Sequence, residues 1–330
     1  MSPTSPDRPL SSVAAVVVAY NGSQFVSLCL ESLGQSSVAL NVIVVDNAST
    51  DDTRKVVGSF SDVMLIENNL NVGFGRGCNT GMAHALNAGA DYILLLNQDA
   101  QVQPTTVGML LEHMQQNPRV GIACPLQFNA GGDAVDDIFL QYYLAPFASR
   151  LISDSIQGKL QRSYVVKHTP AAAWLISAKF LREVGGFDPL FFMYSEDDDI
   201  CRRAAFHGYD VSVVPAARFN HMRAFYVKKK PESLFQQIKR KTSRIRSTLV
   251  ASAKNPQGRP VKNLYHSITK QLCDSMGKLI AHMDWIPFVA SLIASFGTVS
   301  ELPRIFRHRR ISIAKGPHWL NSPTSLERKQ

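Results

Sequence analysis

Residues 13–21 read VAAVVVAYN and residues 41–47 read NVIVVDN, and these two stretches decide the fold class. Each is a short apolar run, rich in β-branched side chains, that ends in polar residues. This is the pattern of a buried strand closed by a turn. Residues 63–67 and 92–96 form two further apolar runs of the same kind. The first third of the chain therefore predicts four buried strands.

The segments between these runs indicate helices. Residues 23–35 have helical spacing, residues 52–60 follow a capping residue (Ser49 or Asp51), and a glycine-rich stretch at 71–81 leads into a helix that ends near residue 88. Strands that alternate with helices predict an α/β fold, a doubly wound and mostly parallel sheet of Rossmann-like type. Helices are expected on both faces of this sheet.

Polar residues follow three of the predicted strands at their carboxyl ends. They are Tyr20 and Asn21 after the first strand, Asp46 and Asn47 after the second, and Asn97 to Asp99 after the fourth. Ligands of doubly wound sheets bind just beyond the carboxyl ends of the strands. We therefore expect a binding site at this edge.

The rest of the chain continues less regularly. A helix is expected at 105–116 and a strand at 120–124, followed by a loop-rich insertion up to about residue 167. An apolar run and a helix are expected over 170–184, and a last strand at 211–214 precedes His221. From residue 228 the sequence is basic with helical spacing.

Charge divides the chain into two parts. Residues 1–227 carry 15 Lys and Arg against 21 Asp and Glu, whereas residues 228–330 carry 20 against 5. The basic part indicates an anionic partner, either lipid headgroups or nucleic acid, unless it is a solvated helical face. Residues 285–299 form the longest apolar stretch, shorter than the ~20 residues of a spanning helix. An interfacial or re-entrant helix and a buried core helix both remain open for it.

Five cysteines lie far apart and form no CxxC pair, which fits a reducing compartment. Residues 1–12 contain three prolines and no apolar core, so they are expected to be a flexible lead-in rather than a signal peptide.

Four consecutive acids, residues 196–199, follow an apolar run and precede Ile-Cys-Arg-Arg. An acidic first turn of a helix, paired with Arg202 and Arg203, is the structural interpretation, and it suits Asp198 and Asp199. Glu196 and Asp197 lie nearer the turn, where a carboxylate is placed to act as a base. Asp99 at a strand end is similarly placed to hold a hard divalent cation, although Asn-x-Asp after a strand is often a simple turn.

Five segments in this order resemble family 2 of the inverting glycosyltransferases, which have the GT-A fold, and bacterial rhamnosyltransferases in particular. The resemblance covers about residues 13–225. The segments are VVAYN (17–21), VVDNASTD (44–51), NVGFGRGCNTG (71–81), LLLNQD (94–99) and SEDDDICRR (195–203).

The resemblance implies roles for single residues. Asp197 matches the general base and is preceded by Glu196. Trp174 falls where acceptor-side residues are found, with a core aromatic as the equal alternative. Asp99 matches the second acid of the metal motif, whose first acid is replaced by Asn97, and His221 matches a histidine that completes the metal site in some relatives. The positions implied to contact the donor nucleotide-sugar are Ala19, Tyr20, Asn21, Asp46, Asn47, Arg76, Asn79 and Asn97.

The expected activity is transfer of rhamnose or a similar sugar from a dTDP- or UDP-sugar to a glycan or lipid-linked acceptor, with Mg²⁺ or Mn²⁺ of modest affinity. The setting implied is cell-envelope polysaccharide synthesis at the cytoplasmic face of the plasma membrane, with an anionic membrane surface and not nucleic acid as the partner. A nucleotidyltransferase and a non-catalytic RNA- or membrane-binding protein are the alternatives. The expected division is a lead-in (1–12), a GT-A domain (13–227, with a nucleotide half at 13–100 and an acceptor half at 101–227) and a basic helical region (228–330).

Overall fold

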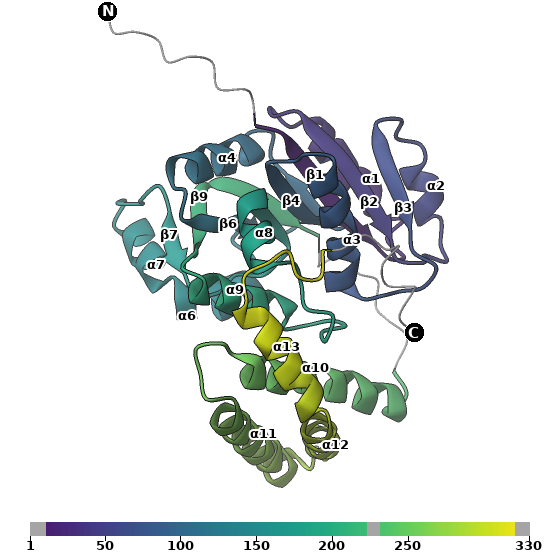
Figure 1. The fold of residues 1–330 in the computed structure, drawn as a ribbon, viewed down its shortest axis with the longest axis vertical. Helices are drawn as coiled ribbons and strands as arrows, with labels where there is room; N and C mark the ends of the chain where they lie inside the picture. The colour runs from purple at the N-terminus through teal and green to yellow at the C-terminus, as the bar shows by residue number, and fades with distance from the viewer. Residues whose placement is uncertain (1–10, 223–231, 321–330) are drawn as a thin grey trace, which may run out of the picture.

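The computed structural model describes residues 11–222 and 232–320 (Figure 1). Most of the expected lead-in at 1–12 and the expected boundary at 227 and 228 lie outside the described residues. A body built around one sheet forms the upper part of the molecule in Figure 1, and a group of long helices forms the lower part.

The described strands form one sheet in the order β3-β2-β1-β4-β8-β6-β9-β5, with β7 added on β9. Strands β1, β2, β3 and β4 are parallel, as the sequence predicts, and β6 is parallel to β9. The strands are β1 (Val13–Ala19), β2 (Leu40–Asp46), β3 (Val63–Glu67), β4 (Tyr92–Asn97), β5 (Ala100–Val102), β6 (Val120–Phe128), β7 (Tyr164–Val166), β8 (Ala173–Ser177) and β9 (Asp210–His221).

Helices cover both faces of the sheet, because alternate side chains of the buried strands point to opposite sides. One hydrophobic cluster joins α1 (Val26–Gly34), α2 (Thr53–Val57) and α4 (Thr106–Gln116) to one face. A second cluster joins α3 (Phe74–Asn87), α8 (Ala178–Val184) and α9 (Glu196–Phe206) to the other. The predicted doubly wound α/β class is confirmed.

Several predicted elements differ from the structure. The helix expected at 52–60 is one short turn that begins after Asp52, and the Asp51 carboxylate accepts a hydrogen bond from the Thr53 amide. The insertion is helical, with Phe139, Leu144 and Leu151 buried, rather than loop-rich. Its elements are too short to show a helical period: α5 (Asp137–Phe139), the π-helix η1 (Leu140–Leu144), α6 (Ala145–Phe147) and α7 (Ser149–Ile156).

Four helices follow the sheet: α10 (Leu234–Lys254), α11 (Pro260–His282), α12 (Ile286–Ser300) and α13 (Leu302–Ile313). In Figure 1, α13 leads the chain from this group back to the sheet domain. There, the amide of Gly186 donates to the carbonyl of His318, and Leu320 is buried in the α3, α8 and α9 cluster. The segment that follows α13 therefore packs against the sheet domain.

No described helix is by itself long and apolar enough to cross a membrane. Taken together, α12 and α13 have the length and composition of a membrane-crossing segment, with a bend of 68° between them.

Candidate active site

The carboxyl ends of β1, β2 and β4 meet at one edge of the sheet. Ala19 is in register with Asp46 on one side, and Val18 is in register with Asn97 on the other. The polar groups that the sequence places after these three strands therefore lie together, as predicted. The amino end of antiparallel β8 lies at the same edge, since the Asn97 amide donates to the Ala172 carbonyl.

Asp46 is almost fully buried at this edge. Its Oδ2 accepts a hydrogen bond from the Ser49 amide, and the exposed Arg54 lies 3.9 Å away. Its Oδ1 is buried and has no hydrogen-bond partner within residues 11–222 and 232–320. A buried carboxylate oxygen normally has a donor, so this atom is suited to receive one from a ligand.

Tyr20 and Asn21 form the rim beside Asp46. The Tyr20 side chain is exposed, and Asn21 has a positive φ of 47°, which an asparagine tolerates better than most residues. The Asn21 Oδ1 accepts from the amide of Thr50, tying the two strand ends together. Tyr20 thus offers a ring to a ligand, and Asn21 shapes the turn.

Gln98 lies within the predicted polar group at residues 97–99, but the sequence assigns it no role of its own. Its side-chain amide donates to the Tyr20 carbonyl at 3.2 Å and accepts from the Tyr20 N–H at 3.0 Å. A Cβ on Gly22 would lie 2.0 Å from its Oε1, so a larger residue at position 22 would displace the Gln98 side chain from these hydrogen bonds. Gln98 therefore holds the rim in place.

Three of the predicted donor residues are already engaged by protein atoms. Asn47 donates to the Gly73 carbonyl and accepts from Asn68. Asn79 makes both of its hydrogen bonds to the backbone of Phe187, at 2.7 and 2.8 Å. Arg76 is exposed and donates to the Pro189 carbonyl at 3.0 Å. Asn47 and Asn79 fix the loops around the site, while Arg76 keeps further donors at its surface.

Ala19 and Asn97 complete the predicted donor set. Ala19 is fully buried and supplies backbone, whereas Asn97 is half-buried, with its carbonyl accepting a weak bond from the Cys29 thiol at 3.5 Å.

Asp99 and His221 are brought together as the resemblance implies. Residue 221 faces Ala100 in the β5–β9 ladder, and the His221 Nε2 lies 3.3 Å from the Asp99 Oδ1, with both side chains buried. The described residues contain no group of three or more His, Cys, Asp or Glu arranged for a metal. Two protein ligands fit a cation that takes its other ligands from diphosphate oxygens and water, as Mg²⁺ commonly does.

Gln127 at the end of β6 lies behind this pair, with its Nε2 3.0 Å from the His221 Nδ1. The Gln127 Oε1 is buried without a hydrogen-bond partner in the described part of the chain. With the Gln127 amide reversed, its Oε1 would accept a hydrogen bond from the Nδ1–H of His221. The lone pair on the His221 Nε2 would then be free for a cation. Gln127 is therefore placed to set the tautomer of His221.

The acidic run begins α9 directly after two residues in the left-handed region, Tyr194 (φ 71°) and Ser195 (φ 64°). Such strain in residues other than glycine is concentrated at functional sites. Asp198 pairs with Arg202 at 2.6 Å, and Asp199 pairs with Arg203 at 3.0 Å, as the structural interpretation expects. These two acids serve the helix.

Glu196 and Asp197 differ from those two acids. Burial of Glu196, and secondarily the charge of Asp197, raise the pKa of Glu196 to about 8, so it holds a proton at neutral pH. Its Oε2 has no hydrogen-bond partner among the residues described. Asp197 is 17% exposed, and its Oδ1 accepts from the Asp198 amide. The run thus contains a buried proton-bearing carboxyl next to a carboxylate that reaches solvent.

His168 also reaches this place, and no local pattern in the sequence marks it. Its Nε2 lies 3.7 Å from the Asp197 Oδ2. The segment before β8 carries it to the site edge because β8 runs antiparallel to β4.

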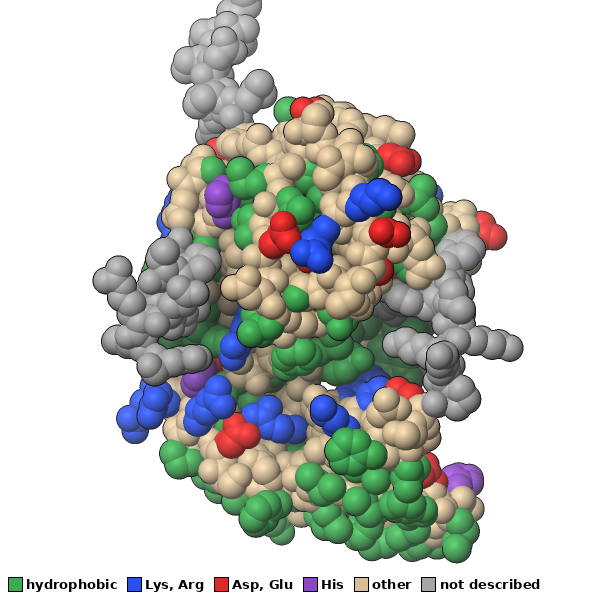
Figure 2. Space-filling model, turned by 90° about the vertical axis from the view of Figure 1, so that its right-hand side faces the viewer, with side chains coloured by type: hydrophobic (Ala, Val, Ile, Leu, Met, Phe, Trp, Pro, Cys, Tyr) green, Lys and Arg blue, Asp and Glu red, His purple; other side chains and the backbone are tan. Residues whose placement is uncertain are grey.

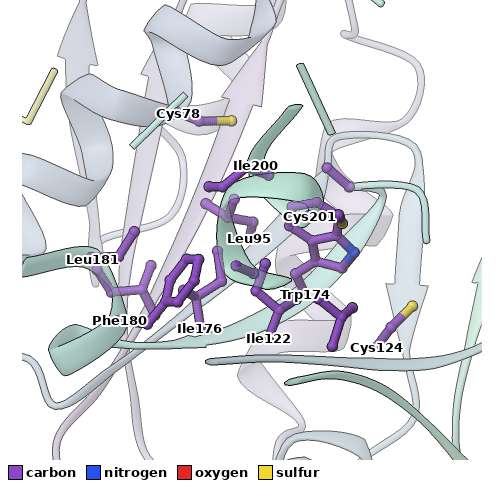
Figure 3. Packing of buried hydrophobic residues seen from close by; sticks show 14 of the residues in the cluster. Cys78, Leu95, Ile122, Cys124, Trp174, Ile176, Phe180, Leu181, Ile200 and Cys201 are labelled. Carbon is purple, nitrogen blue, oxygen red and sulfur yellow. The ribbon is translucent and has the colours of Figure 1, made fainter. Parts of the chain in front are cut away.

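Trp174 is not at the surface. The side chain is 0% exposed and stacks on Phe187 with ring centroids 6.2 Å apart. Figure 3 shows the indole inside the hydrophobic cluster near Cys201 and Ile122. Because β8 is central in the sheet, Trp174 packs the wall behind the site rather than contacting an acceptor.

Sequence comparison gives the family. Residues 14–185 match Glycosyl transferase family 2. The N-acetylglucosaminyl-diphospho-decaprenol L-rhamnosyltransferase of Mycobacterium tuberculosis is 28% identical over 240 residues, which covers 66% of this chain and 78% of that protein. Rhamnosyltransferase WbbL of Escherichia coli K12 is 22% identical over 220 residues, which covers 63% of this chain and 83% of the relative.

Solved structures share the fold. S. aureus TarS 1-349 in complex with UDP superposes with a TM-score of 0.54 at 13% identity, covering 97% of this chain and 92% of that chain. The mannosyltransferase PcManGT from Pyrobaculum calidifontis, in complex with GDP-Man and Mn²⁺, gives 0.52 at 16% identity, covering 88% and 86%. The predicted GT-A fold is confirmed. Because the family match covers over half of the chain, this protein belongs to glycosyl transferase family 2 and is a glycosyltransferase.

Proposed function

We propose that this enzyme transfers a sugar from a nucleoside-diphosphate sugar to an acceptor hydroxyl by one displacement that inverts the anomeric carbon, with Asp197 as the base. The observation that carries the proposal is the division of roles among the four acids of α9. Asp198 and Asp199 pair with arginines, and Glu196 is buried and protonated at neutral pH. Asp197 is left as the carboxylate that meets the solvent side of the turn.

The displacement assigns each group one task. Asp197 accepts the proton of the acceptor hydroxyl while that oxygen attacks the anomeric carbon, and the bond to the nucleoside diphosphate breaks on the opposite face. Glu196, being neutral, adds no second negative charge beside the base. At the strand ends, the Asp46 Oδ1 accepts a hydrogen bond from the nucleobase, and Tyr20 and Asn21 form the rim around it.

The leaving diphosphate needs charge neutralisation. Asp99 and His221 would hold a Mg²⁺ or Mn²⁺ ion, which supplies that neutralisation. Arg76 lies on the α3 turn with exposed guanidinium donors for a phosphate oxygen. Asn97 stands where an acid would add a third charged ligand, so we expect modest metal affinity.

The names of the relatives support a proposal for the donor and acceptor classes. Two of them are named rhamnosyltransferases, and the name of one includes N-acetylglucosaminyl-diphospho-decaprenol. We therefore assign this enzyme a dTDP- or UDP-linked deoxyhexose such as rhamnose, and a glycan or lipid-linked acceptor of the cell envelope.

The helical region supports a membrane location, because α12 buries small side chains and exposes large apolar ones. Its small residues Ala290, Ser291, Ala294 and Thr298 are buried, while four of its larger apolar side chains are exposed: Leu292, Ile293, Phe296 and Val299. Apolar side chains of α11 are exposed as well: Val261, Tyr265, Met276 and Ile280. A wide hydrophobic surface of this kind marks an interaction site.

The basic residues around this hydrophobic surface indicate which partner it binds. Figure 2 shows a broad hydrophobic area at the end of the helical part, with a band of Lys and Arg between it and the hollowed waist of the molecule. Exposed basic residues occur on α10, α11 and α13: Lys239, Arg240, Arg244, Lys262, Lys278, Arg304, Arg307 and Arg310. Apolar side chains bordered by cations fit an anionic lipid surface. The enzyme would thus lie on the inner face of the plasma membrane, next to a lipid-linked acceptor.

The base assignment is tested by transfer kinetics. Asp197→Asn is expected to keep donor affinity and to lose transfer by roughly 10²–10⁴-fold, the usual range for general-base catalysis. Asp198→Asn, the matched control, should lose far less, because Asp198 already pairs with Arg202. Near-normal transfer by Asp197→Asn together with an inactive Glu196→Gln would assign the base to Glu196 instead.

The same assay decides between the classes of function. Release of pyrophosphate instead of nucleoside diphosphate would identify a nucleotidyltransferase. Salt-sensitive RNA binding without any donor turnover would identify a nucleic-acid-binding module.

A further inference from the structure

His168 lies against the carboxylate that we assign as the base. Its Nε2 and the Asp197 Oδ2 are 3.7 Å apart, which is within ion-pair range and longer than a hydrogen bond. Each side chain is 17% exposed. The Nε2 is buried and makes no hydrogen bond within the described ranges. A buried ring nitrogen that faces a carboxylate and has no other partner is suited to pair with it once it carries a proton.

The surroundings hold the His168 ring in this orientation. The rings of Tyr143 and Phe147, from the insertion, meet it edge-on at centroid distances of 5.2 and 5.8 Å. The next residue, Thr169, is fixed to β6 by a hydrogen bond from its hydroxyl to the Cys124 Sγ at 3.0 Å. The ring is therefore wedged between two aromatic side chains and the start of α9, where a change of rotamer is costly.

The charges around the ring favour its protonation. Burial by itself lowers the pKa of His168, but Asp197 first and Asp198 second raise it, against a smaller opposing effect of Arg202. The balance raises this pKa above the ordinary value of 6.5. These three groups all lie on α9, and from the insertion the ring is faced by Tyr143.

We propose that His168 is a positioning residue of the transfer step, which orients the Asp197 carboxylate and pairs with it when the imidazole is protonated. The inference rests on the proposed role of Asp197. When His168 is neutral, Asp197 is free to accept the acceptor proton. When His168 is protonated, the imidazolium neutralises the carboxylate and makes it a poorer proton acceptor. The fall of the transfer rate at acid pH therefore follows the protonation of His168.

Kinetics at varied pH test this role. His168→Gln keeps an N–H donor near the position of Nε2 and has no charged form. It should keep kcat within about threefold of wild type near pH 8 and move the acid limb of kcat to lower pH by about one unit or more. His168→Ala should lower kcat by roughly tenfold over the whole range, with little change in the KM for the donor. His113→Gln is the matched control, since His113 is a half-buried histidine on α4 whose Nε2 lies 2.9 Å from the Ser212 hydroxyl of β9.

A titration by NMR supplies a readout that does not depend on turnover. The His168 signal, identified among the nine histidines by its loss in His168→Gln, should titrate above pH 6.5 in the wild type. In Asp197→Asn its midpoint should fall by about one unit or more, since the charge that favours protonation is gone. An unchanged midpoint, or an unchanged acid limb in His168→Gln, would overturn the inference. Full transfer by Asp197→Asn would instead overturn the proposed function, so the two failures are distinguishable.

Discussion

At the scale of single residues, the site combines groups that the sequence marks with groups that it does not. Asp46, Asp99 and Asp197 each follow an apolar run or stand in an acidic one, so local pattern predicts them. Gln127 and His168 carry no such signal. Gln127 reaches the site because β6 pairs with β9, and His168 reaches it because the strand that follows, β8, pairs with β4. A lone histidine or glutamine in a sequence is usually structural, and the sheet order alone gives these two a role.

Glu196 yields a stability prediction at this scale. Its pKa of about 8 in the folded protein exceeds the ordinary value of 4.5, so the folded state binds more protons between these pH values. The free energy of unfolding therefore falls as pH rises from about 4.5 to about 8. Glu196→Gln removes this penalty, and its gain over wild type should be largest above pH 8. One pKa unit corresponds to about 1.4 kcal/mol, so a gain of at least about 1 kcal/mol is expected.

Urea unfolding of Glu196→Gln and wild type at pH 5.5 and pH 8.5 measures this difference. Glu112→Gln, at an exposed position on α4, is the control and should show no such pH dependence. The same gain for Glu196→Gln at both pH values would contradict a buried, protonated Glu196.

At the scale of elements, α10 braces the start of α9. Ser247 donates to the Met193 carbonyl at 3.1 Å, and Arg202 donates to the Ala251 carbonyl at 2.8 Å. Lys254, fully buried at the end of α10, pairs with Asp188 and with Asp199, the latter at 2.9 Å. The turn that carries the base is therefore held from both sides, by the sheet and by the helical region.

Lys254→Met should destabilise the protein by about 3–5 kcal/mol, since removing one partner of a buried ion pair leaves uncompensated charge. Asp188 and Asp199 would both lose this partner, although His308 remains 2.7 Å from Asp188 and Arg203 remains on Asp199. Chemical unfolding measures the loss, with Lys270→Met on the exposed side of α11 expected within about 0.5 kcal/mol of wild type. A loss below about 1 kcal/mol for Lys254→Met would show that the remaining cations suffice.

The elements that sequence reasoning predicts well are the longest and most periodic. The runs at β1 to β4 are uninterrupted, and the helices between them bury one face, so both their existence and their order follow from the residues. The insertion at 137–156 contains helical pieces of three to eight residues, too short for a period to show. The sequence at β8 predicts an apolar run, and nothing local shows that this run enters the sheet antiparallel to β4. That orientation brings His168 to the site and buries Trp174.

At the scale of the whole molecule, the charge asymmetry of the sequence corresponds to a division in space. The sheet domain carries the acids of the site, and the basic helices carry an apolar surface at their far side (Figure 2). Ile293 and Phe296 on α12 are two of the exposed apolar side chains of this region, at 50% and 80%. A surface with these properties should bind anionic lipid through apolar insertion and through cations, each worth roughly 1 kcal/mol near such a membrane.

Full-length protein is therefore expected to float with vesicles that contain phosphatidylglycerol and to bind neutral phosphatidylcholine vesicles weakly. Binding should fall as salt is raised, because salt screens the attraction between the cations and the lipid headgroups. The screening length is about 10 Å at 0.1 M salt. The variant Ile293→Ser/Phe296→Ser should lose flotation while keeping donor turnover on a soluble acceptor, since neither residue lies at the strand-end site. Ile156→Ser, which changes an equally exposed apolar residue on α7, should float like wild type. Two results together would contradict the membrane proposal. Wild type would bind both kinds of vesicle equally or not at all, and light scattering would show a dimer for wild type and a monomer for the double variant. The surface would then join two copies of this chain.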